Sequence, residues 1–249
     1  VIFCTDFLRK KSFDNGGLMT YSKKVADMTW RGDQPAAFRA GLREFFGNFK
    51  TNKVSALSTL SSVFYSYGSH LVRIELPKAT GYVKKSWIFV RAAFCAFLAM
   101  VVSDLVVLVA GGLGGLTANQ CDVRQSVLRR VYRFDGAMEV ISEGIRKCEE
   151  EKPRPPTHTR ALFYLGEASI HMHFKEASIA DGFYTRIGFL LPRIEEEGEY
   201  DQLSRICRHM AEYYRKVGDR RKASQMEEHS EWARKMAEVQ RIYRKAESK

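Results

Sequence analysis

The 249-residue chain lacks the short motifs that mark most enzymes. It contains no HExxH zinc motif, no GxSxG nucleophile elbow, no phosphate-binding GxxxxGK[ST] loop and no EF-hand loop. Its five cysteines, at positions 4, 95, 121, 148 and 207, form no CxxC pair. Such an odd, scattered set argues against a disulfide framework or zinc site, and favours a reducing compartment or simple burial. The sequence therefore predicts no enzyme, and no catalytic, cofactor-binding or metal-binding residue.

Acidic residues are scarce relative to basic ones, with 29 Asp and Glu against 40 Lys and Arg, a net charge of +11. The excess lies mainly in residues 1–86, which carry 14 basic and 6 acidic residues, or +8. This distribution suits an anionic membrane surface or RNA as a partner. The chain begins with Val1, which fits either removal of a targeting segment or a partial chain.

Charge is almost absent from the 25 residues between Ala92 and Leu116, in which Asp104 is the single charged residue. As a helix this segment would be about 37 Å long, enough to cross a hydrocarbon core of about 30 Å. Four residues before or at its start are the interfacial anchors expected at a bilayer boundary: Lys84, Lys85, Trp87 and Arg91. The sequence predicts a transmembrane helix over residues 87–116, with a buried helix of a soluble core as the alternative.

Asp104 is the most informative residue of this segment. It would lie about 18 Å along the helix from Ala92, and so near the membrane midplane. A charge at that depth marks a functional site, either a proton-handling or ion-pathway carboxylate or an Asp that faces another subunit's helix. Because Arg91 is too far away along the same helix, the partner of Asp104 is expected from another chain. The second interpretation is favoured, since one span cannot build a pathway alone.

Four glycines close the apolar segment: Gly111, Gly112, Gly114 and Gly115. Gly111 and Gly115 form a GxxxG pattern, which lets a second transmembrane helix approach closely. Helix termination at the membrane boundary is the alternative. A phosphate-binding loop is excluded because no Lys-Ser/Thr pair follows. Together with Asp104, the glycines predict a helix that packs against other transmembrane helices.

The segment before the span divides into two parts. Residues 1–34 contain turn signals and no sustained periodicity, so we expect irregular structure. Residues 35–49 and 54–70 show helical spacing of apolar side chains. In the first of these helices an aromatic stripe, which includes Phe38 and Phe45, faces away from the arginines. Such a helix is expected on a membrane surface, on a partner protein or against the protein's own core.

The segment after the span, residues 117–249, reads as a series of helices separated by short turns, and the predicted fold class is all-α. Helices in pairs joined by short turns are typical of an α-solenoid. The predicted organisation is a basic N-terminal region with amphipathic helices (1–86), a transmembrane helix (87–116) and a helical-repeat domain (117–249).

Two stretches of this last segment, RALFYLGEAS and CRHMAEYYRKVGDRRKAS, resemble the tetratricopeptide repeat family. The residues at the family's packing and turn positions are Leu162, Leu165, Gly166, Met210, Ala211, Tyr214, Gly218 and Ala223. Cys207 stands in the place of the family's Trp, and the two stretches are 45 residues apart where the family has 34. The resemblance implies a scaffold that binds proteins and carries over no peptide-clamping residue.

These observations predict a non-catalytic accessory subunit of a multi-subunit membrane complex. The basic composition and cysteine pattern favour the mitochondrial inner membrane, with a respiratory chain complex or ATP synthase as the assembly, in an orientation that the sequence does not fix. The expected partners are other membrane subunits and membrane lipids. No cofactor is expected, and an anionic lipid such as cardiolipin is a candidate ligand. Two alternatives remain: a membrane-anchored receptor or tether with tetratricopeptide-like repeats, and an RNA-associated component of a membrane-attached mitochondrial ribosome.

Overall fold

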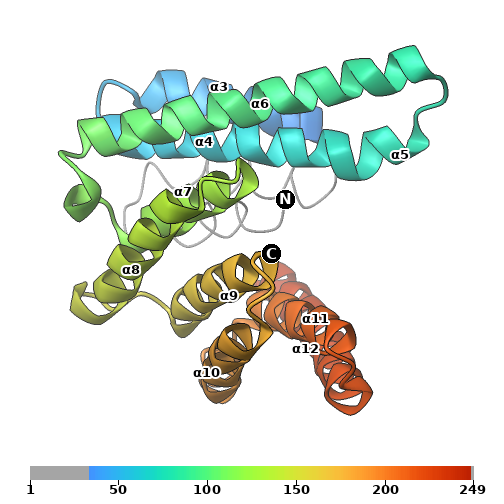
Figure 1. The fold of residues 1–249 in the computed structure, drawn as a ribbon. Helices are drawn as coiled ribbons and strands as arrows, with labels where there is room; N and C mark the ends of the chain where they lie inside the picture. Colours follow the sequence, from blue (N-terminus) through green and yellow to red (C-terminus); the bar gives the residue numbers. More distant parts are fainter. Residues whose placement is uncertain (1–33, 248–249) are drawn as a thin grey trace. The chain divides into compact units, whose positions relative to one another are not determined.

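The computed structural model describes residues 34–247, and every regular element in that range is a helix (Figure 1). The chain divides into two compact units, residues 1–143 and residues 144–249. The expectations for residues 1–33, which include the cysteine at position 4, lie outside the described range. The all-α prediction is confirmed for the residues that the structure describes.

The first unit contains α3 (Gln34–Asn48), α4 (Lys53–His70), α6 (Tyr82–Val109) and α7 (Ala118–Arg130). A π-helical turn, η2 (Leu71–Glu75), and the short α5 (Leu76–Lys78) extend α4 towards α6. A 3-10 turn, η3 (Leu113–Gly115), lies between α6 and α7, and α8 (Phe134–Glu150) leads into the second unit. Among the described helices, α6 alone is long and apolar enough to cross a membrane.

Helices α4 and α6 run antiparallel and pack along their length (Figure 1). The buried seam of α6 repeats every three or four residues: Ile88, Ala92, Cys95, Ala99, Val102 and Val106. Several of these side chains are small, which lets the two helices approach closely. At Gly68 of α4, an added Cβ would lie 3.1 Å from Cys95 Cβ and 3.3 Å from the Ala92 carbonyl oxygen. The α4–α6 contact therefore depends on glycine and alanine.

Helix α4 is enclosed by protein on every side over its first half. The eight consecutive residues 56–63 are all buried, and this run covers more than two helical turns. One of its serines, Ser61, donates a 2.9 Å hydrogen bond to the Ala99 carbonyl of α6. On another side, α3 contacts α4 through the Phe38 ring, whose centroid lies 5.6 Å from that of Phe64. The aromatic stripe of α3 thus packs at Phe38 against the protein's own core.

The span was predicted over residues 87–116, but α6 begins five residues before Trp87 and ends seven residues before Leu116. Two glycines end it: Gly111 and Gly112 have φ of 75° and 110°, values that favour glycine. The Gly112 N–H bonds to the Val107 carbonyl at 2.9 Å, closing the last turn as in a Schellman motif. The four glycines lie beyond the helix and cannot form a GxxxG face on it. Gly111 and Gly112 end the helix, which is the alternative that the sequence left open.

The second unit contains two antiparallel helical hairpins, α9 (Thr157–His173) with α10 (Ala177–Glu196), and α11 (Tyr200–Lys216) with α12 (Arg220–Glu247). Both α9 and α10 also contact α11. The turn between α11 and α12 contains Gly218, with φ of 85°. Helix α10 continues through Pro192, and Leu191 and Ile194 are buried on either side of that proline.

Replacing Gly68 with leucine is expected to destabilise the first unit, because the new side chain would meet Cys95 and the Ala92 backbone. Overpacking of this kind costs about 1–3 kcal/mol of the free energy of unfolding. Gly47→Leu in α3 is the matched control, since an added Cβ there meets nothing within 4 Å. Thermal unfolding followed by circular dichroism measures both variants. Equal melting temperatures for the two would contradict close packing of α4 on α6.

Candidate membrane-facing and partner-binding surfaces

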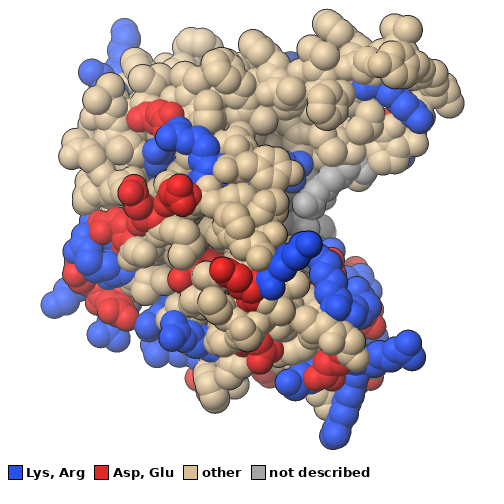
Figure 2. Space-filling view, in the orientation of Figure 1, with Lys and Arg blue, Asp and Glu red and all other residues tan. Residues whose placement is uncertain are grey.

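The side of α6 opposite α4 carries an unbroken row of large apolar side chains. Its members recur every three or four residues and are all exposed: Val83, Trp87, Val90, Phe94, Phe97, Val101, Leu105 and Leu108. We call this row the outer face of α6. The surface over α6 is uncharged along most of the helix, with charged side chains near its ends (Figure 2). From Val83 to Leu108 the outer face is about 37 Å long.

The two sides of α6 differ in side-chain size as well as in exposure. The side towards α4 has Ala92, Cys95 and Ala99, whereas the outer face has Phe94 and Phe97 at the same level. In membrane proteins, small residues concentrate where helices approach one another. An exposed apolar surface this long marks a site that binds a membrane, another protein or an apolar ligand. The outer face is therefore the strongest candidate binding surface of the first unit.

Asp104 has its partners within the same chain. Its Oδ1 accepts a 2.9 Å hydrogen bond from the guanidinium Nη2 of Arg124 on α7. Its Oδ2 lies 3.6 Å from the guanidinium Nη1 of Arg133. Arg124 also donates to Ser103 at 3.1 Å, so its guanidinium bridges two neighbouring α6 residues. The prediction that the partner of Asp104 comes from another chain was wrong, whereas its position at the membrane midplane stays a prediction. Asp104 lies near the C-terminal end of α6, and the turn after that helix brings α7 back against it.

The predicted interfacial anchors fall into two groups. Lys84, Lys85 and Trp87 are exposed at the N-terminal end of α6, and Trp87 keeps 63% of its surface accessible. Arg91 instead bonds to the Tyr67 hydroxyl of α4, and its guanidinium lies 5.8 Å from the centre of that ring. Arg91 thus joins α6 to α4, while the other three residues remain accessible.

In the second unit, the residues at tetratricopeptide-like positions lie at the helix contacts. All seven helical ones are buried, namely Leu162, Leu165, Gly166, Met210, Ala211, Tyr214 and Ala223. Helices α9 and α11 share a burial pattern when aligned with an offset of 45 residues. In that alignment His158, Ala161 and Ala168 correspond to three buried residues of α11.

Two serines join α11 to α12, and α11 also carries a buried thiol. The hydroxyl of Ser204 donates to the Ser230 carbonyl at 2.8 Å, and the hydroxyl of Ser230 donates to the Ser204 carbonyl at 2.7 Å. Burial, with a smaller contribution from the Glu195 carboxylate, raises the pKa of the Cys207 thiol to about 12. Cys207 is therefore protonated at neutral pH and packs as an apolar residue.

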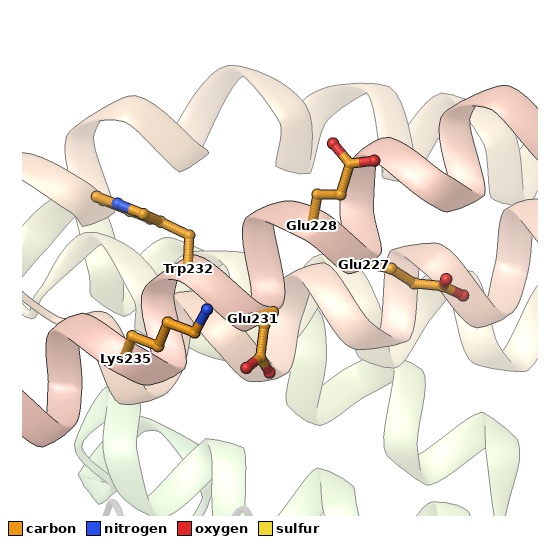
Figure 3. Close-up of a pocket in the computed structure, with 5 residues that line it drawn as sticks. All are labelled: Glu227, Glu228, Glu231, Trp232 and Lys235. Atoms are coloured by element: carbon orange, nitrogen blue, oxygen red, sulfur yellow. The ribbon is translucent and has the colours of Figure 1, made fainter.

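A hollow of about 460 Å³ lies against α12. Its five lining residues all come from that helix: Glu227, Glu228, Glu231, Trp232 and Lys235. Their side chains spread outward from the helix and do not converge on one point (Figure 3). Glu227 pairs with Arg215, and Glu231 with Arg234 at 2.6 Å, so two of the three carboxylates are neutralised. The hollow lacks the converging polar groups of a ligand site.

Within residues 34–247, no group of three or more His, Cys, Asp or Glu side chains could hold a metal ion. No protein-family model, curated protein or solved structure matches the chain. The surfaces described above therefore carry the functional argument.

Sequence reasoning missed the residues that satisfy the polar groups of α6. Tyr67 and Ser61 bond to it from α4, and Arg124 bonds to it from α7. One signal was present for Arg124: it is the first basic residue after the glycine turn, and a chain that reverses there returns along α6. No sequence signal distinguished Ser61 from the other serines of α4.

The Asp104–Arg124 pair is expected to couple more strongly than the Asp104–Arg133 pair. Only 14% of the Arg124 side chain is exposed, against 54% for Arg133. Hydrogen bonds to charged groups contribute about 1.5–3 kcal/mol, and exposed ion pairs at most about 1 kcal/mol. Double-mutant cycles with Asp104→Ala, Arg124→Ala and Arg133→Ala, read by chemical denaturation, measure both coupling energies. A larger coupling to Arg133 would show that Arg124 is not the main partner.

Proposed function

We propose that this protein is a membrane-attached, non-catalytic accessory subunit of a multi-subunit complex. The outer face of α6 is the observation that carries the proposal, because it exposes eight large apolar side chains, and the one carboxylate beside it, Asp104, is paired with Arg124. A surface of this length is costly to leave in water, at about 25 cal/mol for each Å² of apolar area. Attachment to a lipid bilayer would cover it. In this role α6 is the anchor.

The second unit supplies the contact to neighbouring subunits. The resemblance of α9 and of the α11–α12 hairpin to tetratricopeptide repeats supports this role, because repeats of that kind present extended surfaces to other proteins. Large apolar side chains are exposed on its helices, among them Phe189 at 79% and Ile242 at 62%. Aromatic and aliphatic side chains of this size are common anchors in protein–protein interfaces.

The finer assignments remain predictions. A single-pass crossing rests on the length and apolarity of α6. A place in a respiratory chain complex or ATP synthase of the mitochondrial inner membrane rests on the basic charge and the scattered cysteines. A bound anionic lipid such as cardiolipin would suit the exposed Lys84 and Lys85. A reversible receptor or tether is the second candidate, favoured by the exposed apolar side chains of α10 and α12.

Extraction of the full chain from its native membrane with mild detergent tests this function. On blue-native separation, we expect the 28.5 kDa chain to migrate with other subunits in one large band. Phe189→Glu combined with Ile242→Glu should release the chain from that band but leave it in the membrane fraction, because these residues lie in the second unit. Phe94→Glu should instead reduce recovery in the membrane fraction.

Recovery of the unmodified chain as a free species in the detergent extract would contradict a built-in subunit and favour the reversible receptor. Recovery in the soluble fraction before detergent is added would contradict membrane attachment itself.

A further inference from the structure

We propose that α6 lies along the membrane surface, with its outer face immersed in the lipid and α4 on the water side, and does not cross the bilayer. This inference rests on the proposed membrane attachment and specifies its mode. It differs from the crossing that the length and apolarity of α6 alone predict. The lipid acyl chains and headgroups of one leaflet are the ligand.

The first argument is that α6 cannot cross while the rest of its unit stays folded around it. Helix α4 is enclosed by protein over residues 56–63, and α3 packs against it. Helix α3 meets α4 level with the middle of α6. An added Cβ at Gly41 of α3 would lie 2.3 Å from Val63 of α4. Two residues before Val63, Ser61 bonds to the Ala99 carbonyl near the middle of α6. The exposed Arg39 and Arg43 flank Gly41. A crossing would therefore carry two exposed arginines into the hydrocarbon, where charged side chains are strongly disfavoured.

The second argument is the shape of the outer face. Its members lie on one side of the helix only, whereas the opposite side is covered by α4. Helices that lie in the plane of a membrane have this two-sided character, with one apolar side immersed in the headgroup and acyl boundary. The covered side of α6 is itself apolar, with Ile88, Ala92 and Ala99, so the two sides differ in their contacts: α4 covers one and leaves the other exposed. The carboxylate of Asp104 is half-exposed and pairs with Arg124 of α7, so a charged pair borders the outer face near its C-terminal end.

The third argument concerns the occupant. The side chains of the outer face are large, with Phe94, Phe97 and Leu108 each more than half exposed. Helix partners in membranes favour small residues at the contact, and this chain already uses small residues where α6 meets α4. The described part of the first unit, residues 34–143, carries 13 Lys and Arg against 7 Asp and Glu, a net +6. A positively charged unit with a large apolar face fits an anionic lipid surface.

Measurement of depth along α6 tests the inference. Each variant of the full chain keeps a single tryptophan on the outer face. With Trp30→Phe and Trp232→Phe, Trp87 itself is the first probe. Adding Trp87→Phe then allows a single tryptophan at position 94, 101 or 108. Each variant is bound to vesicles of phosphatidylcholine and phosphatidylserine that carry bromine at defined acyl positions. We expect the same shallow bromine position to quench all four tryptophans most strongly, because the outer face would lie parallel to the surface.

A crossing helix would give a graded result. Positions 87 and 94 would then differ in depth by roughly 10 Å, since seven residues rise by that distance. That outcome would overturn the in-plane inference and leave membrane attachment standing. Phe46→Trp in α3 is the matched control, because Phe46 is 73% exposed but outside the outer face. It should stay unquenched, and strong quenching there would also overturn the inference.

Vesicle binding itself separates this inference from the proposed function. We expect Phe94→Glu to lower vesicle binding at least tenfold and Phe46→Glu to change it less than twofold. No vesicle binding by the unmodified chain would overturn both the attachment and its in-plane mode. Self-association that Phe94→Glu abolishes, in the absence of vesicle binding, would identify the outer face as a contact between copies of the chain.

Discussion

Close packing of α4 on α6 is the interaction on which the first unit depends. The glycine at position 68 and the alanines at positions 92 and 99 bring the two backbones together, so that a serine of α4 can reach a carbonyl of α6. Because that contact uses small side chains, the large side chains of α6 are left on its other side. The exposed apolar face is thus a consequence of how the inner face packs. Its location therefore follows from the fold itself.

The polar groups at the edge of this apolar helix are satisfied from neighbouring helices. Tyr67 of α4 bonds to Arg91, and Arg124 of α7 bonds to Asp104. The glycines after Val109 make the second bond available, because they end α6 and let the chain turn back. In the second unit, Ser204 of α11 and Ser230 of α12 each bond to the other's carbonyl, which requires the two helices to approach closely. Small residues therefore allow close helix contacts in both units.

The existence of α6 could be predicted from the sequence, because 25 residues with a single charge have few alternatives to an apolar helix. The predicted C-terminal end of α6 was wrong. Glycine favours both helix termination and close helix packing, and composition does not distinguish the two. The partner of Asp104 could not be predicted because it lies on a different helix, 20 residues further along the chain. Helix α4 reads as a serine-rich amphipathic segment, and only tertiary packing reveals that it is enclosed. In the second unit the spacing of large and small residues was enough to place buried positions such as Leu165 and Met210.

The central claim is that α6 has one side on protein and the opposite side on lipid. Spin labels placed singly at positions 86–108 of the vesicle-bound chain, with their accessibility to oxygen measured, test this claim most directly. The account predicts an oscillation of about 3.6 residues, with maxima at positions such as 94, 97 and 101 and minima at 95, 99 and 102. High accessibility at every position would show a helix surrounded by lipid, detached from α4, and would contradict the account.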